Sequence, residues 1–364
     1  MARQMTKRYE FQPDYAVPPG ATLQETIDSL GMTQRDLALR TGMAPKTINE
    51  IIKGKAPITS DTSVLLDRVT GVPTHMWNNL EANYRDQLAR ITDRERLKSD
   101  LEWLRTIPTK ELIARGVIED PNDKVTLLHA VLRFFGVGSP AQWREVWMRP
   151  AGAFRMSAKF KRDPGAVATW LRLGELQAQK VPTKVYDKVR FRRGLDEIRK
   201  LTVEPCDVFQ PRMIELAAPA GVAVAFVREI KKCSVSGVAR WLSPDKALIQ
   251  LSLRYKSDDQ FWFSFFHEAG HILNDPKKEV YIDDGDSSDD DREGQANRFA
   301  ADFLVPHRFQ DRLSSLATAS QIRTFAGLIG VAPGIVVGRL QRAKMVPWPT
   351  TLNSLKRRFD WKAA

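Results

Sequence analysis

The sequence has little cysteine and no long apolar run. Two cysteines, Cys206 and Cys233, occur among 364 residues, and neither belongs to a Cys-x-x-Cys pair. This excludes a disulfide framework and a cysteine-rich zinc site, so we expect reduced thiols. The chain also lacks the run of about 18 apolar residues that a membrane-spanning helix needs, and its polar first residues lack the apolar segment of a signal peptide. These absences predict a cytoplasmic protein with no membrane partner.

Positive charge is in excess. The chain has 56 lysines and arginines against 44 aspartates and glutamates, a formal net charge of +12. This balance suits a polyanionic partner, and nucleic acid is the first candidate, although a solvated basic surface gives the same composition. At roughly 150 residues per domain, the length suggests about two domains, each able to bury its own core.

The apolar pattern divides the chain into three regions. Residues 1–90 contain a polar arm and short helices separated by glycines, residues 91–200 have amphipathic helical spacing, and residues 201–364 combine strands and helices. Three apolar runs in the last region predict strands: 222–227, 237–242 and 247–252. We therefore predict a mainly α fold with a small antiparallel β-sheet, in the α+β class.

Within the first region, two short helices joined by a tight turn are predicted. Leu37 and Ala38 lie on the inward face of the first helix, and Gly42 permits the turn. Pro45 fits the first turn of the second helix. An apolar stripe then points to the core, made of Ile48, Ile51 and Ile52.

The polar face of the second helix is a candidate DNA-binding surface. Side chains on such a face can bond base edges and phosphates when the helix lies in a major groove. The candidate DNA-binding residues are Lys46, Thr47, Asn49, Glu50 and Lys53. Any small helical hairpin has similar spacing, so the pattern alone leaves a purely structural role open.

Residues 19–85 resemble the Xre-type helix-turn-helix of HigA-like antitoxins. The resemblance is carried by Lys46–Lys55 with Ile58-Thr59, and by Trp77–Tyr84. It implies an all-α domain that binds a double-stranded DNA operator as a homodimer. It also implies autorepression of a toxin–antitoxin operon, with a cognate toxin as protein partner.

The strongest chemical signal is the sequence HEAGH at residues 267–271. Residues four apart on a helix share a face, so His267 and His271 can aim their imidazoles at one zinc ion. Glu268 lies one residue on, where a carboxylate can act as general base toward an activated water. The alternative is a buried structural pair of histidines.

The helix that carries this motif is predicted from its flanks. Ser257 and Gln260 fit a capping box at its start. The aromatic residues between 261 and 266 make the helix apolar all round, which predicts burial. Two imidazoles and a carboxylate in that setting need a compensating partner, and a metal ion supplies one.

A catalytic zinc needs a third protein ligand and an open position. No histidine stands in the HExxHxxGxxH position, and the next candidate is Glu293. This residue shares a face with Asn297 on a second predicted helix that ends before Pro306. The acidic loop before it, residues 279–293, is interpreted as solvated surface, with a lid over the site as the alternative.

Residues from about 200 to 345 resemble the ImmA/IrrE metallopeptidases. The resemblance is carried by Phe261–Leu273 and Glu293–Pro306, and it implies a zincin-like α+β domain. The implied Zn2+ ligands are His267, His271 and Glu293, with Glu268 as the catalytic base. The segment Ile322–Leu340 has the pattern of a second helix-turn-helix, but in this family it packs onto the peptidase.

These resemblances predict a DNA-binding transcriptional regulator with a zinc-dependent endopeptidase domain that cleaves a regulatory protein. The alternative is a non-proteolytic antitoxin or repressor whose zinc domain is a scaffold or a sensor. The motif supports metal binding and does not show turnover, so the sequence leaves open whether the chain is an enzyme.

Overall fold

The computed structural model describes residues 15–148, 163–252, 256–277, 281–283 and 291–360, with backbone alone at 281–283. Most of the acidic loop at 279–293 therefore lies outside the described residues. The chain divides into two compact units, Met1–Leu101 and Glu102–Ala364.

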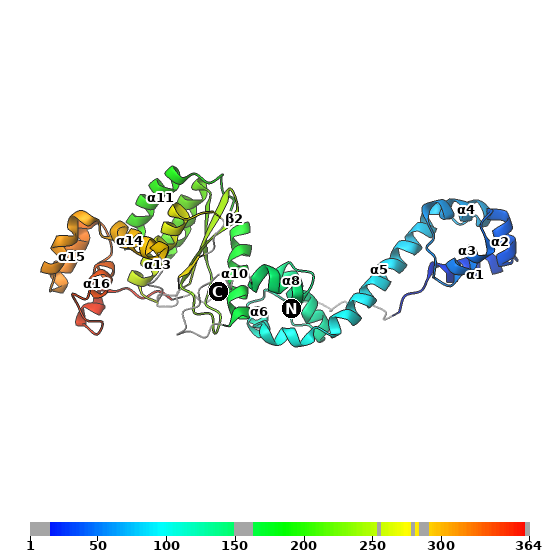
Figure 1. Ribbon diagram of the computed structural model, residues 1–364, viewed down its shortest axis with the longest axis horizontal. Coiled ribbons are helices and arrows are strands. Elements are labelled where there is room, and N and C mark those ends of the chain that lie inside the picture. Colours follow the sequence, from blue (N-terminus) through cyan, green and yellow to red (C-terminus); the bar gives the residue numbers. More distant parts are fainter. Residues whose placement is uncertain (1–14, 149–162, 253–255, 278–280, 284–290, 361–364) are drawn as a thin grey trace, which may run out of the picture. The chain divides into compact units, whose positions relative to one another are not determined.

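The first unit is entirely helical in its described residues. Its helices are α1 (Pro19–Ser29), α2 (Gln34–Thr41), α3 (Pro45–Ile52), α4 (Ser60–Thr70) and α5 (Thr74–Lys98), shown in Figure 1. A capping box between Thr33 and Asp36 starts α2, and Gly42 ends it with a left-handed φ of 74°. Pro45 opens α3, as the sequence predicted.

Close packing of α1 against α3 holds the helix pair in place. A Cβ on Gly20 would lie 2.2 Å from the carbonyl oxygen of Ile51, so only glycine fits there. The loop after α3 is tied to α5, because the Ile58 N–H donates to Glu81 Oε2 over 3.0 Å. The core beneath includes Leu23, Ile27, Leu37, Ile48, Ile51, Leu66 and Trp77.

The second unit is helical around one small sheet. Its helices before the sheet are η1 (Leu101–Thr106), α6 (Thr109–Ala114), α7 (Lys124–Phe135), α8 (Pro140–Trp143), the π-helical turn η2 (Arg144–Met148), α10 (Pro164–Gln179), α11 (Lys188–Lys200), η3 (Leu201–Val203), α12 (Cys206–Ala217) and η4 (Ala218–Ala220). Those after its third strand are α13 (Asp258–Asn274), α14 (Asp291–Leu304), η5 (His307–Ser315), α15 (Ala319–Ile329), α16 (Pro333–Arg342) and η6 (Thr351–Leu355).

Four strands in the described residues form one sheet in the order β1-β3-β2-β4. They are β1 (Val222–Phe226), β2 (Gly237–Ser243), β3 (Lys246–Leu251) and β4 (Tyr281–Asp283). The mainly helical α+β prediction is confirmed, but the sheet is mixed. Strand β2 pairs antiparallel with β3 and β4, whereas β1 pairs parallel with β3. The sequence missed this because apolar runs locate strands and carry no information on their direction.

Both faces of the sheet are covered by helices, which explains why most residues of β1 and β3 are buried, whichever face they point to. Helix α10 covers one face, where Gln250 Nε2 donates to the Trp170 carbonyl and Arg240 Nη2 donates to the Leu171 carbonyl, at 2.7 and 2.8 Å. Helices α11, α12 and α13 pack on the other face (Figure 1). Helix α13 is thereby buried, as its apolar sequence predicted.

The start of α13 is capped differently from the prediction. Ser257 is the N-cap residue, but its side chain makes no capping hydrogen bond. The backbone of the C-terminal segment binds here instead. The Asp258 N–H donates to the Arg357 carbonyl over 3.0 Å, and the Phe359 N–H donates to the Lys256 carbonyl over 2.9 Å. A tertiary contact therefore replaces the local capping box.

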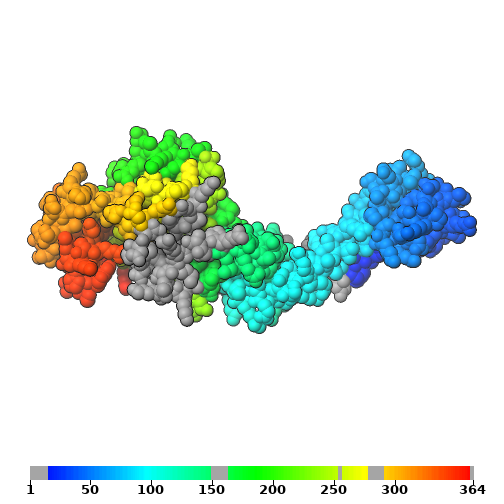
Figure 2. Space-filling view, in the orientation of Figure 1, coloured from blue at the N-terminus to red at the C-terminus, as the bar shows by residue number. Residues whose placement is uncertain are grey.

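Helices α15 and α16 pack onto the domain, as expected for Ile322–Leu340. In Figure 2 their orange and red residues form a surface continuous with that of α14. Gly334 and Gly338 let α16 cross α13 closely, because a Cβ at these positions would lie 2.3 Å from Asp258 Oδ1 and 2.6 Å from Asp259 Oδ2. Among the described residues, no single helix has the length and apolarity to cross a membrane. Only α15 and α16 together pass that test, with a bend of 108° between them.

Candidate metal centre and nucleic-acid interface

The structure brings His267, His271 and Glu293 together. The Nε2 atoms of the two histidines are 3.0 Å apart. Glu293 reaches both from α14: Oε2 lies 3.2 Å from His267 Nε2, and Oε1 lies 3.3 Å from His271 Nε2. One ligand atom from each of the three lies within 4.8 Å of the others. Two adjacent turns of α13 and the first turn of α14 thus point three donors at one place.

This donor set fits a divalent metal ion. With bonds of about 2.0–2.1 Å, two nitrogen or oxygen ligands of tetrahedral zinc are about 3.3 Å apart, close to the separations found here. Two imidazoles and one carboxylate are also a ligand set of catalytic zinc sites, which keep a fourth position for water or substrate. The group can therefore hold a metal ion.

Each histidine is oriented by a second partner. His267 Nδ1 lies 3.1 Å from Asn297 Oδ1 on α14, and His271 Nδ1 lies 2.5 Å from Asp275 Oδ2, just after α13. Both partners are oxygen acceptors, so each Nδ1 carries the proton and each Nε2 presents its lone pair to the cluster when the ring is neutral. These contacts prepare both rings for metal binding.

The cluster is strongly coupled electrostatically. Burial alone disfavours a charged His271, but hydrogen bonds to Asp275 and Glu293 outweigh it and raise the pKa of His271 to about 9. Burial likewise opposes ionisation of Glu293, but hydrogen bonds from His267 and His271 lower the pKa of Glu293 to about 2. Without metal, a protonated imidazole and a carboxylate therefore neutralise each other, and a metal ion must displace the proton.

Glu268, the predicted base, is fully buried next to the sheet. A Cβ on Gly237, the first residue of β2, would lie 2.8 Å from Glu268 Oε1 and 2.9 Å from Glu268 Cγ. A glycine at this strand position therefore leaves the room that the carboxylate occupies. A second glycine, Gly270, lets α14 approach, because its Cβ would lie 3.3 Å from Ala296 Cα.

The candidate DNA-binding residues lie on α3 in the first unit, except Lys53, which is the C-cap residue of that helix. Lys46 and Lys53 are exposed, whereas Thr47, Asn49 and Glu50 are half-buried. Lys46 Nζ lies 3.8 Å from Glu50 Oε1, and the Lys46 side chain is 85% exposed, so this pair adds little stability. The exposed ammonium groups are available to phosphates.

A chain of amides fixes Asn49. Its Nδ2 donates to Gln34 Oε1 on α2 over 3.3 Å, and Gln34 Nε2 donates to Gln24 Oε1 on α1 over 2.8 Å. Three helices thus hold one polar side chain of α3 in a defined orientation. Amides of this kind present both a donor and an acceptor, which reading of base edges requires.

Several of these residues were missed at the sequence level. Asp275 follows His271 at the i,i+4 spacing of helical neighbours, so that pair carried a usable signal. Asn297 was seen to share a face with Glu293, but its contact with His267 depends on how α14 packs. Gly237 carried no local signal, because the carboxylate it accommodates belongs to another element.

Comparison with known families matches both units. The Helix-turn-helix family model matches residues 23–77, from α1 into α5. The IrrE N-terminal-like domain model matches residues 231–333, which include β2, the metal cluster and α15. The chain belongs to the Xre-type helix-turn-helix family and carries an IrrE-like domain behind that unit. Both resemblances inferred from the sequence are thereby confirmed.

Curated relatives match the helix-turn-helix unit. The uncharacterized HTH-type transcriptional regulator YddM of Escherichia coli (strain K12) is 35% identical over 63 residues, 17% of this chain and 67% of that protein. Virulence-associated protein I of Dichelobacter nodosus is 33% identical over 70 residues, 19% of this chain and 65% of that protein. The chain thus spans about two thirds of the length of each relative.

Solved structures also show similarity. An addiction module antidote protein of a HigA family from Coxiella burnetii is 25% identical, with 23% of this chain and 92% of that chain covered and a TM-score of 0.22. The Pseudomonas aeruginosa antitoxin HigA with higBA promoter is 21% identical, with 23% and 94% covered and a TM-score of 0.22.

Proposed function

We propose that this chain is a DNA-binding transcriptional regulator with a zinc-dependent endopeptidase domain that cleaves a regulatory protein. The observation that carries the proposal is the convergence of His267, His271 and Glu293 in one buried cluster beside Glu268. In this proposal residues 1–90 form the DNA-binding domain, residues 91–200 form a helical connecting region, and residues 201–364 form the peptidase domain.

The proposed DNA binding is supported by the residues of α3 and by the relatives that share the helix-turn-helix unit. Lys46 and Lys53 offer exposed positive charge, and the amide chain holds Asn49 in a defined orientation. YddM, which shares this unit, is named a transcriptional regulator. We propose that a homodimer binds an operator with α3 in the major groove. Its protein partner would be a peptidase substrate or a cognate toxin.

In the proposed peptidase each residue of the metal cluster has a role. Zn2+, held by His267, His271 and Glu293, would supply a Lewis acid that polarises water and a peptide carbonyl. Glu268 would accept the proton of the attacking water and return it to the departing amine. Asp275 and Asn297 would keep both imidazoles aimed at the ion.

The proposal is tested by incubating the zinc-loaded protein with its operon partner. We expect a defined fragment that disappears with chelator and in Glu268→Gln. The variant should keep its zinc, measured by metal analysis, and its operator affinity. A fragment that persists in Glu268→Gln would remove Glu268 from the chemistry.

The same samples decide between a peptidase and a non-proteolytic regulator. A zinc scaffold or sensor would give operator binding that changes with chelator, and no fragment from the partner. Glu293→Ala should lose zinc in either case, because it supplies the third ligand. Its matched control is Asp302→Ala, an exposed acid on the same helix that should keep the ion. Zinc retained in Glu293→Ala would refute the ligand set.

A further inference from the structure

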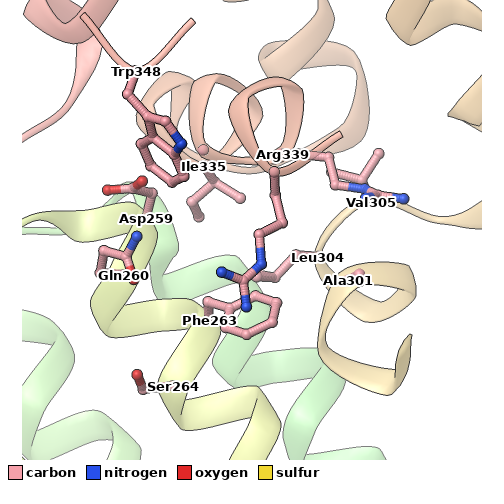
Figure 3. Close-up of a pocket in the computed structure, with 12 residues that line it drawn as sticks. Asp259, Gln260, Phe263, Ser264, Ala301, Leu304, Val305, Ile335, Arg339 and Trp348 are labelled. Atoms are coloured by element: carbon pink, nitrogen blue, oxygen red, sulfur yellow. The ribbon is translucent and has the colours of Figure 1, made fainter. Parts of the chain in front are cut away.

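A pocket of about 350 Å³ lies along α13, one helical turn from the metal cluster. Figure 3 shows Arg339 extending from α16 toward Phe263 on α13 and Leu304 at the end of α14, with Trp348 beside Asp259. The cluster residues do not line this pocket. Its volume is near the low end of about 300–1,000 Å³ for ligand sites, which suits a side chain with adjoining backbone.

The pocket has a basic side. Arg339 Nε is buried and has no hydrogen-bond partner among the described residues. The Arg342 guanidinium lies at the exposed rim, 5.8 Å from the centre of the Phe263 ring. Two guanidinium groups on one helix therefore face a cavity with apolar walls, a setting that selects for a carboxylate or phosphate.

An unsatisfied acceptor lies on the opposite side. Asp259 is only 5% exposed, and its Oδ2 accepts from Lys356 Nζ over 2.6 Å. Its Oδ1 is buried without a partner in the described part of the chain. Buried polar groups are nearly always hydrogen-bonded, so an unused acceptor and an unused donor in the wall of one pocket favour an occupant that brings polar groups into it.

The pocket and the metal cluster lie along the same two helices, α13 and α14. Phe263 and His267 are one turn apart on α13, and their ring centroids are 6.3 Å apart. On α14, Ala301 and Leu304 of the pocket continue the stripe that begins with Glu293. Four residues of helix rise about 6 Å, which about two residues of extended peptide span. The separation of pocket and metal along α13 is therefore one that two or three residues of a bound peptide can span.

We propose that this pocket binds an acidic side chain of the substrate, about two or three residues from the bond that is cut. Arg339 and Arg342 bind the carboxylate. Phe263 and Trp348 cover the aliphatic part of the side chain. The inference rests on the proposed peptidase function, and it makes acidic peptides the preferred substrate class.

Binding is tested first, without turnover. The probes are blocked hexapeptides that carry a single Glu at each position in turn. Each has a twin, the same peptide with Gln in place of that Glu. Both are added to metal-free Glu268→Gln protein. The indole N–H resonance of Trp348, assigned with Trp348→Phe, reports occupancy of the pocket. We expect the best Glu peptide to bind about tenfold more tightly than its twin, because hydrogen bonds to charged groups are the stronger ones.

In Arg339→Gln the affinities of each Glu peptide and its Gln counterpart should differ by no more than about twofold, since the partly buried Arg339 guanidinium supplies most of the discrimination. The matched control is Arg323→Gln, an exposed arginine on α15 outside the pocket, which should keep the full preference. Equal affinity of all twins for the parent protein, or a preference that survives Arg339→Gln, would overturn the inference. The inference would also be overturned if a free carboxylate such as phenylacetate shifted the Trp348 resonance and no peptide shifted it.

Cleavage is tested separately on a mixed peptide library with zinc-loaded wild-type protein. We expect acidic residues to be enriched at one position near the cut, and the enrichment to vanish in Arg339→Gln. Glutamate-selective binding with no cleavage would refute the peptidase and leave the pocket assignment standing. Cleavage with no acidic preference, together with equal binding of the twins, would refute the pocket assignment alone.

Discussion

Gly237→Ala should impair catalysis while the metal stays bound. The added Cβ would lie 2.9 Å from Glu268 Cγ and 2.8 Å from its Oε1. Carbon atoms pack best at about 3.5–4.0 Å, so the Glu268 side chain must shift by about 0.6–1 Å. A misplacement of about 1 Å in a catalytic group can cost about 100-fold in rate. We therefore expect kcat to fall about 10- to 100-fold, or about 1.4–2.7 kcal/mol.

The assay is fragment formation from the operon partner, with zinc content measured on the same preparation. Zinc should remain, because the three atoms nearest to the added Cβ all belong to Glu268 and none to a ligand. Overpacking should also lower the free energy of unfolding by about 1–3 kcal/mol. The matched control is Gly327→Ala on α15, where a Cβ meets nothing within 4 Å. Undiminished cleavage by Gly237→Ala would show that Glu268 does not need its present position.

Three further predictions concern the metal, pH and DNA. Asp275→Ala should lower zinc affinity about 10- to 100-fold, measured by competition with a chelator, because His271 loses the acceptor that orients it. Stability of the metal-free protein should respond to pH through two groups. Glu293, with its pKa lowered to about 2 from 4.5, contributes fully above pH 4.5 and loses its contribution as pH falls through 2. His271, with its pKa raised to about 9 from 6.5, contributes fully below pH 6.5 and loses its contribution as pH rises through 9. Urea unfolding of the metal-free chain should therefore show the full contribution of the pair between pH 4.5 and 6.5. The matched Glu293→Gln variant should lose the dependence on the acid side and keep part of it on the alkaline side, because Asp275 still raises the pKa of His271. Lys53→Ala should weaken operator and random DNA alike and reduce the salt slope of binding by about 1. A loss confined to the operator would instead assign Lys53 to base recognition.

The metal centre shows where sequence reasoning succeeds and where it stops. His267 and His271 were correctly expected to share a face, because neighbours on one helix follow from its period of 3.6 residues. Their buried surroundings were also predictable from the aromatic residues of α13. The capping box at Ser257 was wrong, because the C-terminal segment supplies the contacts at that helix start. Local patterns cannot anticipate a partner that arrives from a hundred residues away.

The sequence by itself determined the helix-turn-helix family, the IrrE-like domain, the helix pair of the first unit and the adjacent imidazoles, since all of these depend on short-range spacing. The packing of α14 on α13 decided that Glu293 meets both histidines and that Asn297 supports one of them. The crossing of α16 over α13 decided the pocket, and the place of β2 decided why residue 237 is glycine. Such distances depend on side-chain volumes at contacts between elements, and chain order does not encode them directly.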